Sequence, residues 1–345
     1  MSGFADRLIR WQKRHGRHDL PWQRTQDPYP VWLSEIMLQQ TQVATVVPYY
    51  ERFLGRFPTV AALAAAPVEQ VMELWSGLGY YARARNLHAC AREVMATHGG
   101  EFPRAPAALA ELPGIGRSTA NAIAAFCFGA RMPILDGNVK RVLCRCLGIE
   151  GSPGTAALES RLWRHAEELL PSCDLPAYIQ GQMDLGATVC TRARPRCEIC
   201  PLAGTCIAHR ENRVAELPTP RPRKTLPERE ATLLVLRHGD RVLFERRPPA
   251  GIWGGLLSLP ELPQGMEPVA HGAAHLGVCI ATVSPAPTFS HVFTHFRLHI
   301  RPLVCAAEPL AQAGEPRWQW LDEEQWARAA LPAPIRRILG LEAFR

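Results

Sequence analysis

Between residues 213 and 229 the sequence changes character, and this stretch constrains the fold most. It reads RVAELPTPRPRKTLPER, with four prolines, five Lys or Arg residues and few apolar side chains. Such a segment cannot bury a core of its own, so we expect an extended linker. The chain of 345 residues is long enough for a separate core on each side. The sequence therefore predicts two domains, residues 1–212 and 230–345, joined by residues 213–229.

The apolar pattern differs on the two sides of this linker. From Phe4 to about Ala208, long segments of helical periodicity are separated by Pro and Gly, which predicts an all-α domain. After the linker, two short apolar runs flank a Gly-Asp turn at 239–240, and LHIRPLVC (298–305) is typical of a further strand. A last helix is expected from Pro334 to Leu341. The predicted fold class is multidomain, an all-α domain followed by an α+β domain.

Charge and cysteine usage indicate the partner and the compartment. The formal net charge of +7 suits a polyanionic partner such as DNA. The N-terminus has no apolar stretch of signal-peptide length, and no run of about 18 apolar residues occurs anywhere. We therefore expect a cytoplasmic, nucleoid-associated monomer without a membrane segment. In such a compartment the eleven cysteines favour free thiols or metal ligands over disulfides.

Four of the cysteines lie in one short loop, residues 190–206, with gaps of six, two and five residues. A loop with four thiols is typical of a metal site, and both zinc and a cubane iron–sulfur cluster accept four thiolates. Arg192, Arg194 and Arg196 share the loop, so the metal would brace a basic segment that contacts the DNA backbone. The predicted ligands are Cys190, Cys197, Cys200 and Cys206.

LPGIG at 112–116 stands between two helical patterns, and Ser118 follows at the start of the second. The glycines Gly114 and Gly116 let backbone N–H groups approach a phosphate, and the next helix adds its dipole. This pattern predicts a grip on DNA that is independent of base sequence. An ordinary loop between helices is the alternative.

Glu35 stands in WLSEIMLQQTQ (32–42), which is apolar nearly all round and therefore typical of a buried helix. At helical spacing it shares a face with Leu38, Gln39 and Gln42, which indicates a polar-lined but dry cavity. Desolvation is expected to raise the pKa of Glu35 and keep it protonated near neutrality, as a general acid requires. A solvated surface glutamate is the alternative.

Asp136 ends the apolar run Pro133–Leu135 at an expected helix start. It could serve only as an N-cap. Together with Glu35, however, it forms the pair of carboxyls that cleaves a glycosidic bond, with Glu35 protonated and Asp136 ionised. Glu35 would protonate the leaving base, and Asp136 would stabilise the positive charge that develops on the sugar.

Several strings of the chain resemble one family. They are WLSEIMLQQTQV (32–43), GLGYYARARNL (77–87), ILDGNVKRV (134–142) and MDLGATVCTRARPRCEICPL (183–202). They resemble the MutY type of adenine DNA glycosylase, within the helix-hairpin-helix glycosylase superfamily, and the resemblance covers nearly the whole chain. It implies double-stranded DNA with A:8-oxoguanine or A:G mispairs as substrate. It also implies a [4Fe-4S] cluster, rather than zinc, on the four loop cysteines.

The resemblance implies roles for single residues. Glu35 would protonate adenine N7, Asp136 would be the second catalytic carboxylate, and Asn138 would position the water or that carboxylate. Leu38 and Trp22 would line the pocket for the flipped adenine.

Four further residues concern the opposite strand and possible strand cleavage. Gln39 and Tyr80 are similar to residues that wedge beside the oxidised guanine, although Tyr80 could be an ordinary helix aromatic. Relatives that also cut the strand carry a lysine where this chain has Ser118, so a monofunctional glycosylase is implied. Lys140 is a nearby amine that leaves weak lyase activity open.

The second domain resembles the Nudix-like domain attached to MutY, and Phe289, Ser290 and His291 would recognise 8-oxoguanine. The glutamate-rich helix that holds Mg²⁺ in Nudix hydrolases has no counterpart in residues 257–268. An ordinary turn between strands is the alternative for the 289–291 string. Three other functions stay open: a bifunctional thymine-glycol type of glycosylase, a hairpin protein that only binds DNA, and a nucleotide hydrolase.

Overall fold

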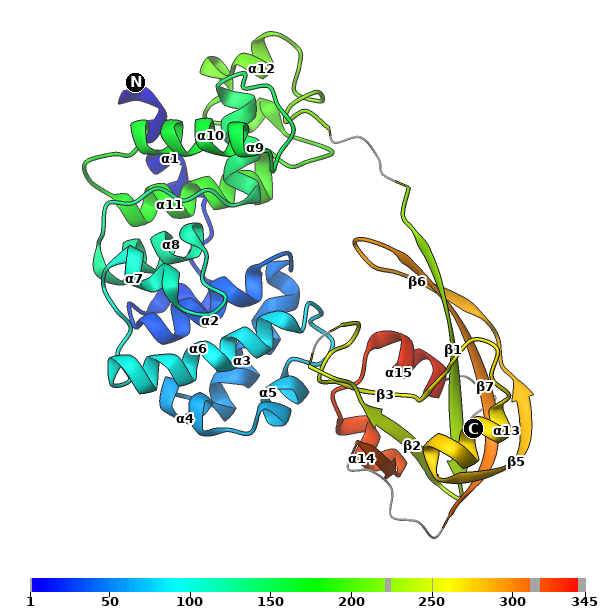
Figure 1. Cartoon of the computed structure of the whole chain (residues 1–345). Coiled ribbons are helices and arrows are strands. Elements are labelled where there is room, and N and C mark those ends of the chain that lie inside the picture. The colour runs from blue at the N-terminus through cyan, green and yellow to red at the C-terminus, as the bar shows by residue number, and fades with distance from the viewer. Residues whose placement is uncertain (1, 221–224, 250, 311–316, 341–345) are drawn as a thin grey trace. The chain divides into compact units, whose positions relative to one another are not determined.

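The computed structural model describes residues 2–220, 225–249, 251–310 and 317–340 (Figure 1). The chain forms two compact units. The first comprises Met1–Ala66 and Asn86–Arg223, and the second comprises Pro67–Arg85 and Lys224–Arg345. The division after Arg223 falls inside the expected linker, whereas the assignment of Pro67–Arg85 to the second unit departs from the expected ranges.

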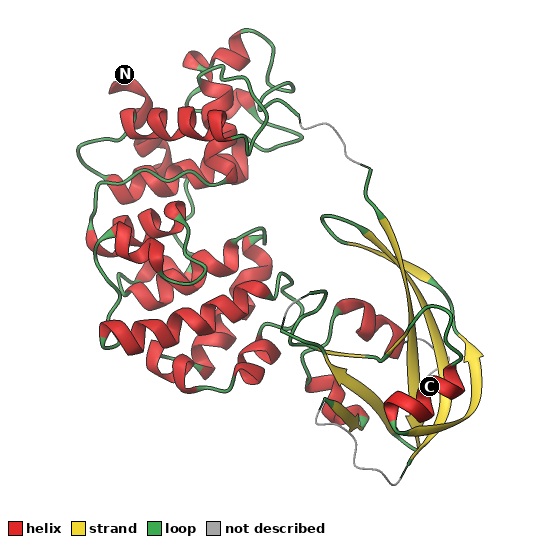
Figure 2. Ribbon diagram, in the orientation of Figure 1, coloured by secondary structure: helices red, strands yellow, loops and turns green. Residues whose placement is uncertain are grey.

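Helices make up the first part of the chain, as Figure 2 shows, followed by a strand-rich part. No helix in the described ranges is long and apolar enough to cross a membrane. The helical elements are α1 (Ser2–His15), η1 (Pro21–Arg24), α2 (Pro28–Leu38), α3 (Val43–Arg56), α4 (Val60–Ala65), α5 (Val68–Leu74), α6 (Ala82–His98), α7 (Pro106–Glu111), α8 (Arg117–Phe128), α9 (Gly137–Cys146), α10 (Ala156–Glu168), α11 (Leu175–Asp184), η2 (Leu185–Val189), η3 (Cys197–Ile199), η4 (Ala203–Thr205) and α12 (Ile207–Arg210).

Local sequence signals set the ends of these helices. The Asp27 carboxylate accepts the Tyr29 N–H at 2.9 Å and caps α2, whose first residue is a proline. At the other end of this helix the sequence-based expectation was wrong. The helix ends at Leu38, and Gln40 takes a left-handed backbone conformation with φ 58°. A glutamine gives no sequence signal of a left-handed turn, so the sequence predicts a helix that continues to Gln42.

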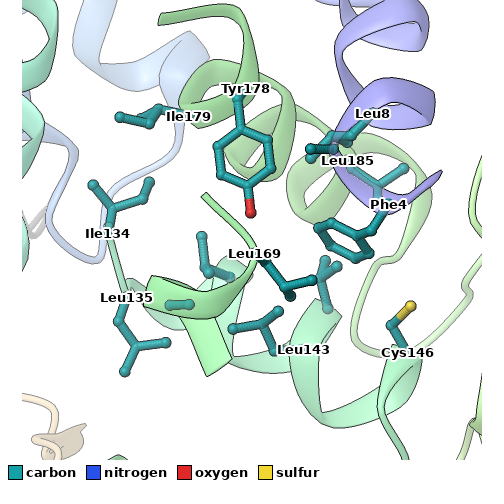
Figure 3. Packing of buried hydrophobic residues seen from close by; sticks show 14 of the residues in the cluster. Phe4, Leu8, Ile134, Leu135, Leu143, Cys146, Leu169, Tyr178, Ile179 and Leu185 are labelled. Atoms are coloured by element: carbon teal, nitrogen blue, oxygen red, sulfur yellow. The ribbon is translucent and has the colours of Figure 1, made fainter. Parts of the chain in front are cut away.

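One buried apolar cluster of the first unit lies among α1, α8, α9, α10 and α11. Figure 3 shows Phe4 and Leu8 of α1 beside Tyr178 and Leu185, with Leu143 of α9 close by. Phe4 and Tyr178 meet edge to face at 6.4 Å between ring centroids. This packing fixes α9, whose N-terminus carries Asp136.

Part of the expected linker 213–229 packs against the first unit. Leu217 is buried, and its carbonyl accepts a hydrogen bond from Arg145 Nε at 2.8 Å. The Gly151 N–H donates to Thr219 Oγ1 at 3.0 Å. Residues 213–219 therefore pack against the first unit, and 221–224 lie outside the described residues.

The strands of the second unit form one mixed sheet in the order β3-β2-β1-β7-β5. The strands β1 and β7 pair in parallel, whereas β6 pairs with β7, β4 with β1 and β8 with β2, all antiparallel. The elements are β1 (Glu228–His238), β2 (Arg241–Arg246), β3 (Leu257–Ser258), β4 (Glu261–Leu262), α13 (Pro268–His271), η5 (Gly272–Leu276), β5 (Val278–Pro285), β6 (Phe289–Val292), β7 (Arg297–Pro309), β8 (Trp318–Leu321), α14 (Glu323–Arg328) and α15 (Ala333–Leu339).

The expected hairpin and the α+β class are confirmed. β1 and β2 are joined at Gly239, which has φ 60°, and His238 pairs with Arg241. β7 contains the expected strand 298–305. The last helix is α15, and Leu341 at its expected end lies outside the described residues. Apolar side chains of α15 cover one core of the sheet, and residues of η5 and β5 belong to another.

Candidate active site

The first unit contains a pocket into which α2 presents Glu35. Trp22 of η1 and Leu38 at the end of α2 also line it, together with Gln180 of α11. Three of the sequence-predicted residues therefore share this pocket. Its full lining is Gln12, Arg17, His18, Leu20, Trp22, Gln23, Thr25, Gln26, Val31, Ser34, Glu35, Leu38, Val43, Phe126, Pro176, Ala177, Gln180 and Met183.

The Glu35 carboxyl is poised to carry a proton at neutral pH. Its neighbours on α2 are buried apolar side chains such as Ile36 and Met37. Desolvation by this surrounding, and to a smaller extent the negative charge of Asp136, raise the pKa of Glu35 to about 7. The apolar pattern of residues 32–42 predicts this raised pKa.

Asp136 caps α9 and also acts electrostatically on Glu35. One carboxylate oxygen accepts the Val139 N–H at 2.7 Å, and the other accepts the Asn138 side-chain amide at 3.2 Å. Desolvation raises the pKa of Asp136, while these hydrogen bonds and the charge of Arg141 oppose that rise. Asp136 is not among the residues that line the pocket. The structure shows it as the N-cap of α9, and its catalytic role stays a prediction.

Arg141 ties Asn138 to the segment before the cysteine loop. Its Nη2 atom donates to Asn138 Oδ1 at 2.7 Å and to the Gly186 carbonyl at 2.8 Å. Its Nε atom donates to the Cys190 carbonyl at 2.8 Å. Since Asn138 in turn holds the Asp136 carboxylate, a continuous set of hydrogen bonds links Cys190 to the candidate site.

The predicted hairpin lies between α7 and α8. Gly114 has φ 78°, and a β-carbon there would come within 2.8 Å of Asn86 Cβ, so only glycine fits. Gly116 is the N-cap of α8 with open space around its α-carbon. The Ser118 hydroxyl accepts the Leu135 N–H at 3.0 Å, which fixes the backbone next to Asp136.

The four loop cysteines line one small pocket together with Arg145. Arg145 Nη1 donates to Cys190 Sγ at 3.4 Å, and backbone N–H groups of Leu202 and Ala208 are directed at Cys200 and Cys206. No three His, Cys, Asp or Glu side chains in the described ranges are placed to hold a single metal ion. Four sulfurs around one pocket, with N–H donors directed at them, fit the thiolate ligand set of an iron–sulfur cluster.

The remaining DNA-related residues of the helical part are not among those that line the pocket. Gln39 is the C-cap of α2 in the first unit. Tyr80 belongs to the second unit, is 46% exposed and has φ 49°, in a turn before α6 rather than in a helix. The Lys140 ammonium forms an ion pair with Glu159 at 2.6 Å.

The 289–291 string is a strand, β6, and not a turn. Its side chains alternate between the two faces of the sheet. Phe289 and His291 pair with the core residues Ile300 and Leu298 of β7. Ser290 lies on the opposite face, beside His299. The three side chains therefore cannot all contact one base.

Sequence reasoning missed one wall of the pocket. Arg17 pairs with the buried Asp184 at 2.7 Å, and Gln180 donates to the same carboxylate at 2.8 Å. Asp184 could have been found by the argument used for Glu35, a carboxylate within an apolar helix. Arg17 and Gln180 carry no such signal.

Two family models match the chain. The "HhH-GPD superfamily base excision DNA repair protein" model matches residues 33–168, and the NUDIX domain model matches residues 231–341. The adenine DNA glycosylase of Buchnera aphidicola (Acyrthosiphon pisum) is 35% identical over 97% of this chain and 96% of its own length. The human adenine DNA glycosylase is 31% identical over 98% of this chain and 73% of its own.

The chain belongs to the adenine DNA glycosylase family. The fold of its helical part agrees, since a thermostable thymine-DNA glycosylase structure aligns with a TM-score of 0.56 at 29% identity. That alignment covers 61% of this chain and 96% of the other. The expected family and fold class are thereby confirmed, a helical glycosylase domain followed by a Nudix-like one.

Proposed function

We propose that this member of the adenine DNA glycosylase family removes adenine from A:8-oxoguanine or A:G mispairs in double-stranded DNA. The observation that carries the proposal is the Glu35 carboxyl, set in the Trp22 and Leu38 pocket with a pKa raised to about 7. An acid of this strength keeps a large protonated fraction at neutral pH and can give its proton to a leaving base. The enzyme would act as a monomer on nucleoid DNA.

The reaction requires the adenine to leave the base stack and enter the pocket. Glu35 protonates N7, the bond between N9 and the sugar breaks with its electron pair going to the base, and an oxocarbenium-like sugar remains. The Asp136 carboxylate stabilises that positive charge, and Asn138, which donates to it at 3.2 Å, holds it in place. Addition of water then completes the hydrolysis.

Strand cleavage is not part of the proposed reaction. A lyase needs an amine to form a Schiff base with the sugar, and Ser118 offers a hydroxyl that already accepts the Leu135 N–H. The Lys140 amine is already engaged in an ion pair with Glu159 at 2.6 Å. Both features favour a monofunctional glycosylase over a bifunctional one.

We propose that Cys190, Cys197, Cys200 and Cys206 hold a [4Fe-4S] cluster. The four thiolates would hold the cluster, which would brace the loop and would do no chemistry on the base. The loop would present Arg192 and Arg194, both exposed, to DNA phosphates. The hairpin glycines Gly114 and Gly116 would offer further backbone N–H donors.

The second unit would recognise the oxidised guanine through β6, and Gln39 and Tyr80 would fill the gap left by the flipped base. Residues 268–276 of α13 and η5 carry no Asp or Glu, which disfavours a Mg²⁺-dependent nucleotide hydrolase. Incubation with oxidised dGTP and Mg²⁺ tests that second function. Release of pyrophosphate would support it against lesion recognition.

The main test uses three duplexes, with adenine opposite 8-oxoguanine, guanine or thymine. We expect alkali-labile sites at adenine in the first two only, and none before alkali treatment. Glu35→Gln should abolish them while binding the same duplexes, and Glu51→Gln, an exposed change of equal charge, should retain them. A Glu35→Gln variant as active as the wild type would refute acid catalysis by this residue.

A further inference from the structure

Two histidines of the second unit lie close together on the helical segment next to β5. His271 is the last residue of α13, and His275 follows four residues later in η5. Their ring centroids are 5.1 Å apart, and the two ring planes are inclined at 38°. Both α13 and η5 contact β5 (Figure 1). The two imidazoles therefore lie side by side on one face of this segment.

The His271 ring carries a buried nitrogen without a partner. The residue is only 7% exposed, and its Nδ1 atom has no hydrogen-bond partner among the described residues. An unpaired buried polar atom is costly in free energy, and native proteins normally pair it with protein, water or an ion. His275 is exposed, so a ligand can reach the pair from solvent.

The backbone between the two histidines is held in place by β5. A β-carbon at Gly272 would come within 2.8 Å of Ile280 Cδ1 and 3.3 Å of Val278 Cγ2. Leu276, which follows His275, is buried in the apolar cluster that contains these two side chains. The segment cannot shift far without losing this close packing. The two rings are therefore preorganised, which lowers the entropic cost of binding a ligand between them.

The chemistry and the spacing of the pair match a metal site. Histidines at positions i and i+4 of a helix place two imidazoles on one metal ion. With Zn–N bonds of about 2.0–2.1 Å and a tetrahedral angle, two such rings have centroids roughly 5 Å apart. We propose that His271 and His275 bind one divalent transition-metal ion such as Zn²⁺ or Ni²⁺. Imidazole suits these ions, whereas Mg²⁺ prefers oxygen ligands.

The protein supplies two ligands of this ion, and water supplies the others. No group of three His, Cys, Asp or Glu side chains in the described ranges is placed to hold a metal ion. The unfolded chain does not hold the two rings together, so the bound ion stabilises the folded second unit. The site is distinct from the cysteine loop, which belongs to the first unit. The proposal does not depend on the glycosylase reaction.

The test is equilibrium dialysis of the full-length protein against Ni²⁺. We expect a site whose Kd rises at least about tenfold in His275→Ala, because the chelate loses one of its two ligands. His275 is exposed, so this variant should fold normally. His271→Ala should weaken binding to a similar extent, and its thermal unfolding checks that loss of the buried ring leaves the unit folded. An excess of Mg²⁺ should not displace the nickel.

Two controls separate a built site from binding to scattered surface histidines. The double variant His275→Ala/Ala273→His keeps the number of histidines but places the second ring at i+2, where it does not face His271. It should bind nickel as weakly as His275→Ala. His238→Ala removes an exposed histidine of the same unit, whose ring contacts Trp320. This variant should keep the wild-type Kd.

Thermal unfolding provides a second readout. Nickel should raise the unfolding midpoint of the wild type and leave that of His275→Ala unchanged. The proposal is overturned if His275→Ala or the double variant keeps the wild-type Kd, because nickel then binds adventitiously elsewhere. It is also overturned if Mg²⁺ displaces the nickel, or if the wild type binds none. In that last case a water molecule is left as the partner of His271 Nδ1.

Discussion

The environment that suits Glu35 for acid catalysis also lowers the stability of the folded protein. In the unfolded chain its carboxyl ionises around 4.5, whereas in the folded protein the pKa is about 7. Between these values the unfolded state has released a proton that the folded state still binds, so stability falls as the pH rises. Above about pH 7 the full pKa difference applies, and it lowers the free energy of unfolding by an amount on the order of 3 kcal/mol.

We therefore predict that Glu35→Gln is inactive and yet more stable than the wild type at pH 8. The amide cannot ionise, so it escapes the cost of a buried charge. The two unfolding midpoints should converge as the pH is lowered toward 4. Urea or thermal unfolding at several pH values measures this, with the exposed Glu51→Gln as the control for loss of one carboxylate. A variant less stable than the wild type at pH 8 would contradict a desolvated Glu35.

The same pKa sets the pH dependence of the chemistry. Because a general acid works only while protonated, the single-turnover rate should fall by about tenfold between pH 6 and pH 8. Rate constants must be taken at saturating enzyme, so that DNA binding does not contribute. A rate that stays level or rises through pH 8 would be incompatible with Glu35 as the acid.

These residues also show what a sequence can disclose about a site. Glu35 could be found because a carboxylate in an apolar helix is costly unless a cavity receives it. Asp136 could be paired with it through the chemistry of glycosidic-bond cleavage, which needs two carboxyls in unlike environments, and the family resemblance supported the pairing. Its local signal alone is the same as that of an ordinary N-cap. Arg17 reaches the pocket by pairing with Asp184, 167 residues away in sequence, and no local pattern encodes such a contact.

At the scale of elements, the start of α9 depends on its contact with η2. A β-carbon at Gly186 would come within 2.5 Å of Asn138 Cβ. Gly186→Ala should therefore push back Asn138, which holds the Asp136 carboxylate. We expect a loss of about 1–3 kcal/mol of stability from overpacking, with a marked drop in excision rate.

Gly55→Ala is the matched control for that prediction. Gly55 lies in α3 with no atom near the position of an added β-carbon. Alanine there should be neutral or stabilise by about 0.5–1 kcal/mol through helix propensity, with normal activity. Single-turnover rates and unfolding midpoints of both variants decide the matter. If Gly186→Ala excises adenine at the wild-type rate, the position of Asn138 is not critical.

Elements were predicted better than their ends and faces. The β1–β2 hairpin was located by its two short apolar runs around a Gly-Asp turn, and α2 by a string that is apolar nearly all round, as in a buried helix. The apolar pattern did not show that α2 ends at Leu38, because the left-handed Gln40 has no compositional signal. Nor did it assign β6 as a strand, since four residues paired only with β7 are too few to show alternation.

At the scale of the whole molecule, the proline-rich stretch predicts a domain boundary, but no sequence signal assigns Pro67–Arg85 to the second unit. This segment joins the second unit through hydrogen bonds such as Arg85 Nη1 to the Gly254 carbonyl at 2.7 Å. Arg336 Nη2 likewise donates to Ser76 Oγ at 3.3 Å. Contacts between residues so far apart in sequence leave no local pattern, and only the three-dimensional structure places them.

The net charge of +7 belongs to this scale as well, and it predicts salt-dependent binding to DNA. Each cation that neutralises a phosphate adds about −0.9 to the slope of log affinity against log salt. Arg192 and Arg194 are exposed on the cysteine loop, and no carboxylate pairs with either in the described part of the chain. Replacing either by Gln should therefore make the slope shallower by about 1.

Arg328→Gln provides the comparison, because Arg328 is already paired with Glu324 at 2.6 Å on α14 and has little charge to offer a phosphate. Its slope should equal that of the wild type. Binding is measured by fluorescence anisotropy in the Glu35→Gln background, where the duplex stays intact, from low to moderate salt. If Arg192→Gln and Arg194→Gln leave the slope unchanged, the loop does not contact the backbone and its cysteines stabilise only the protein itself.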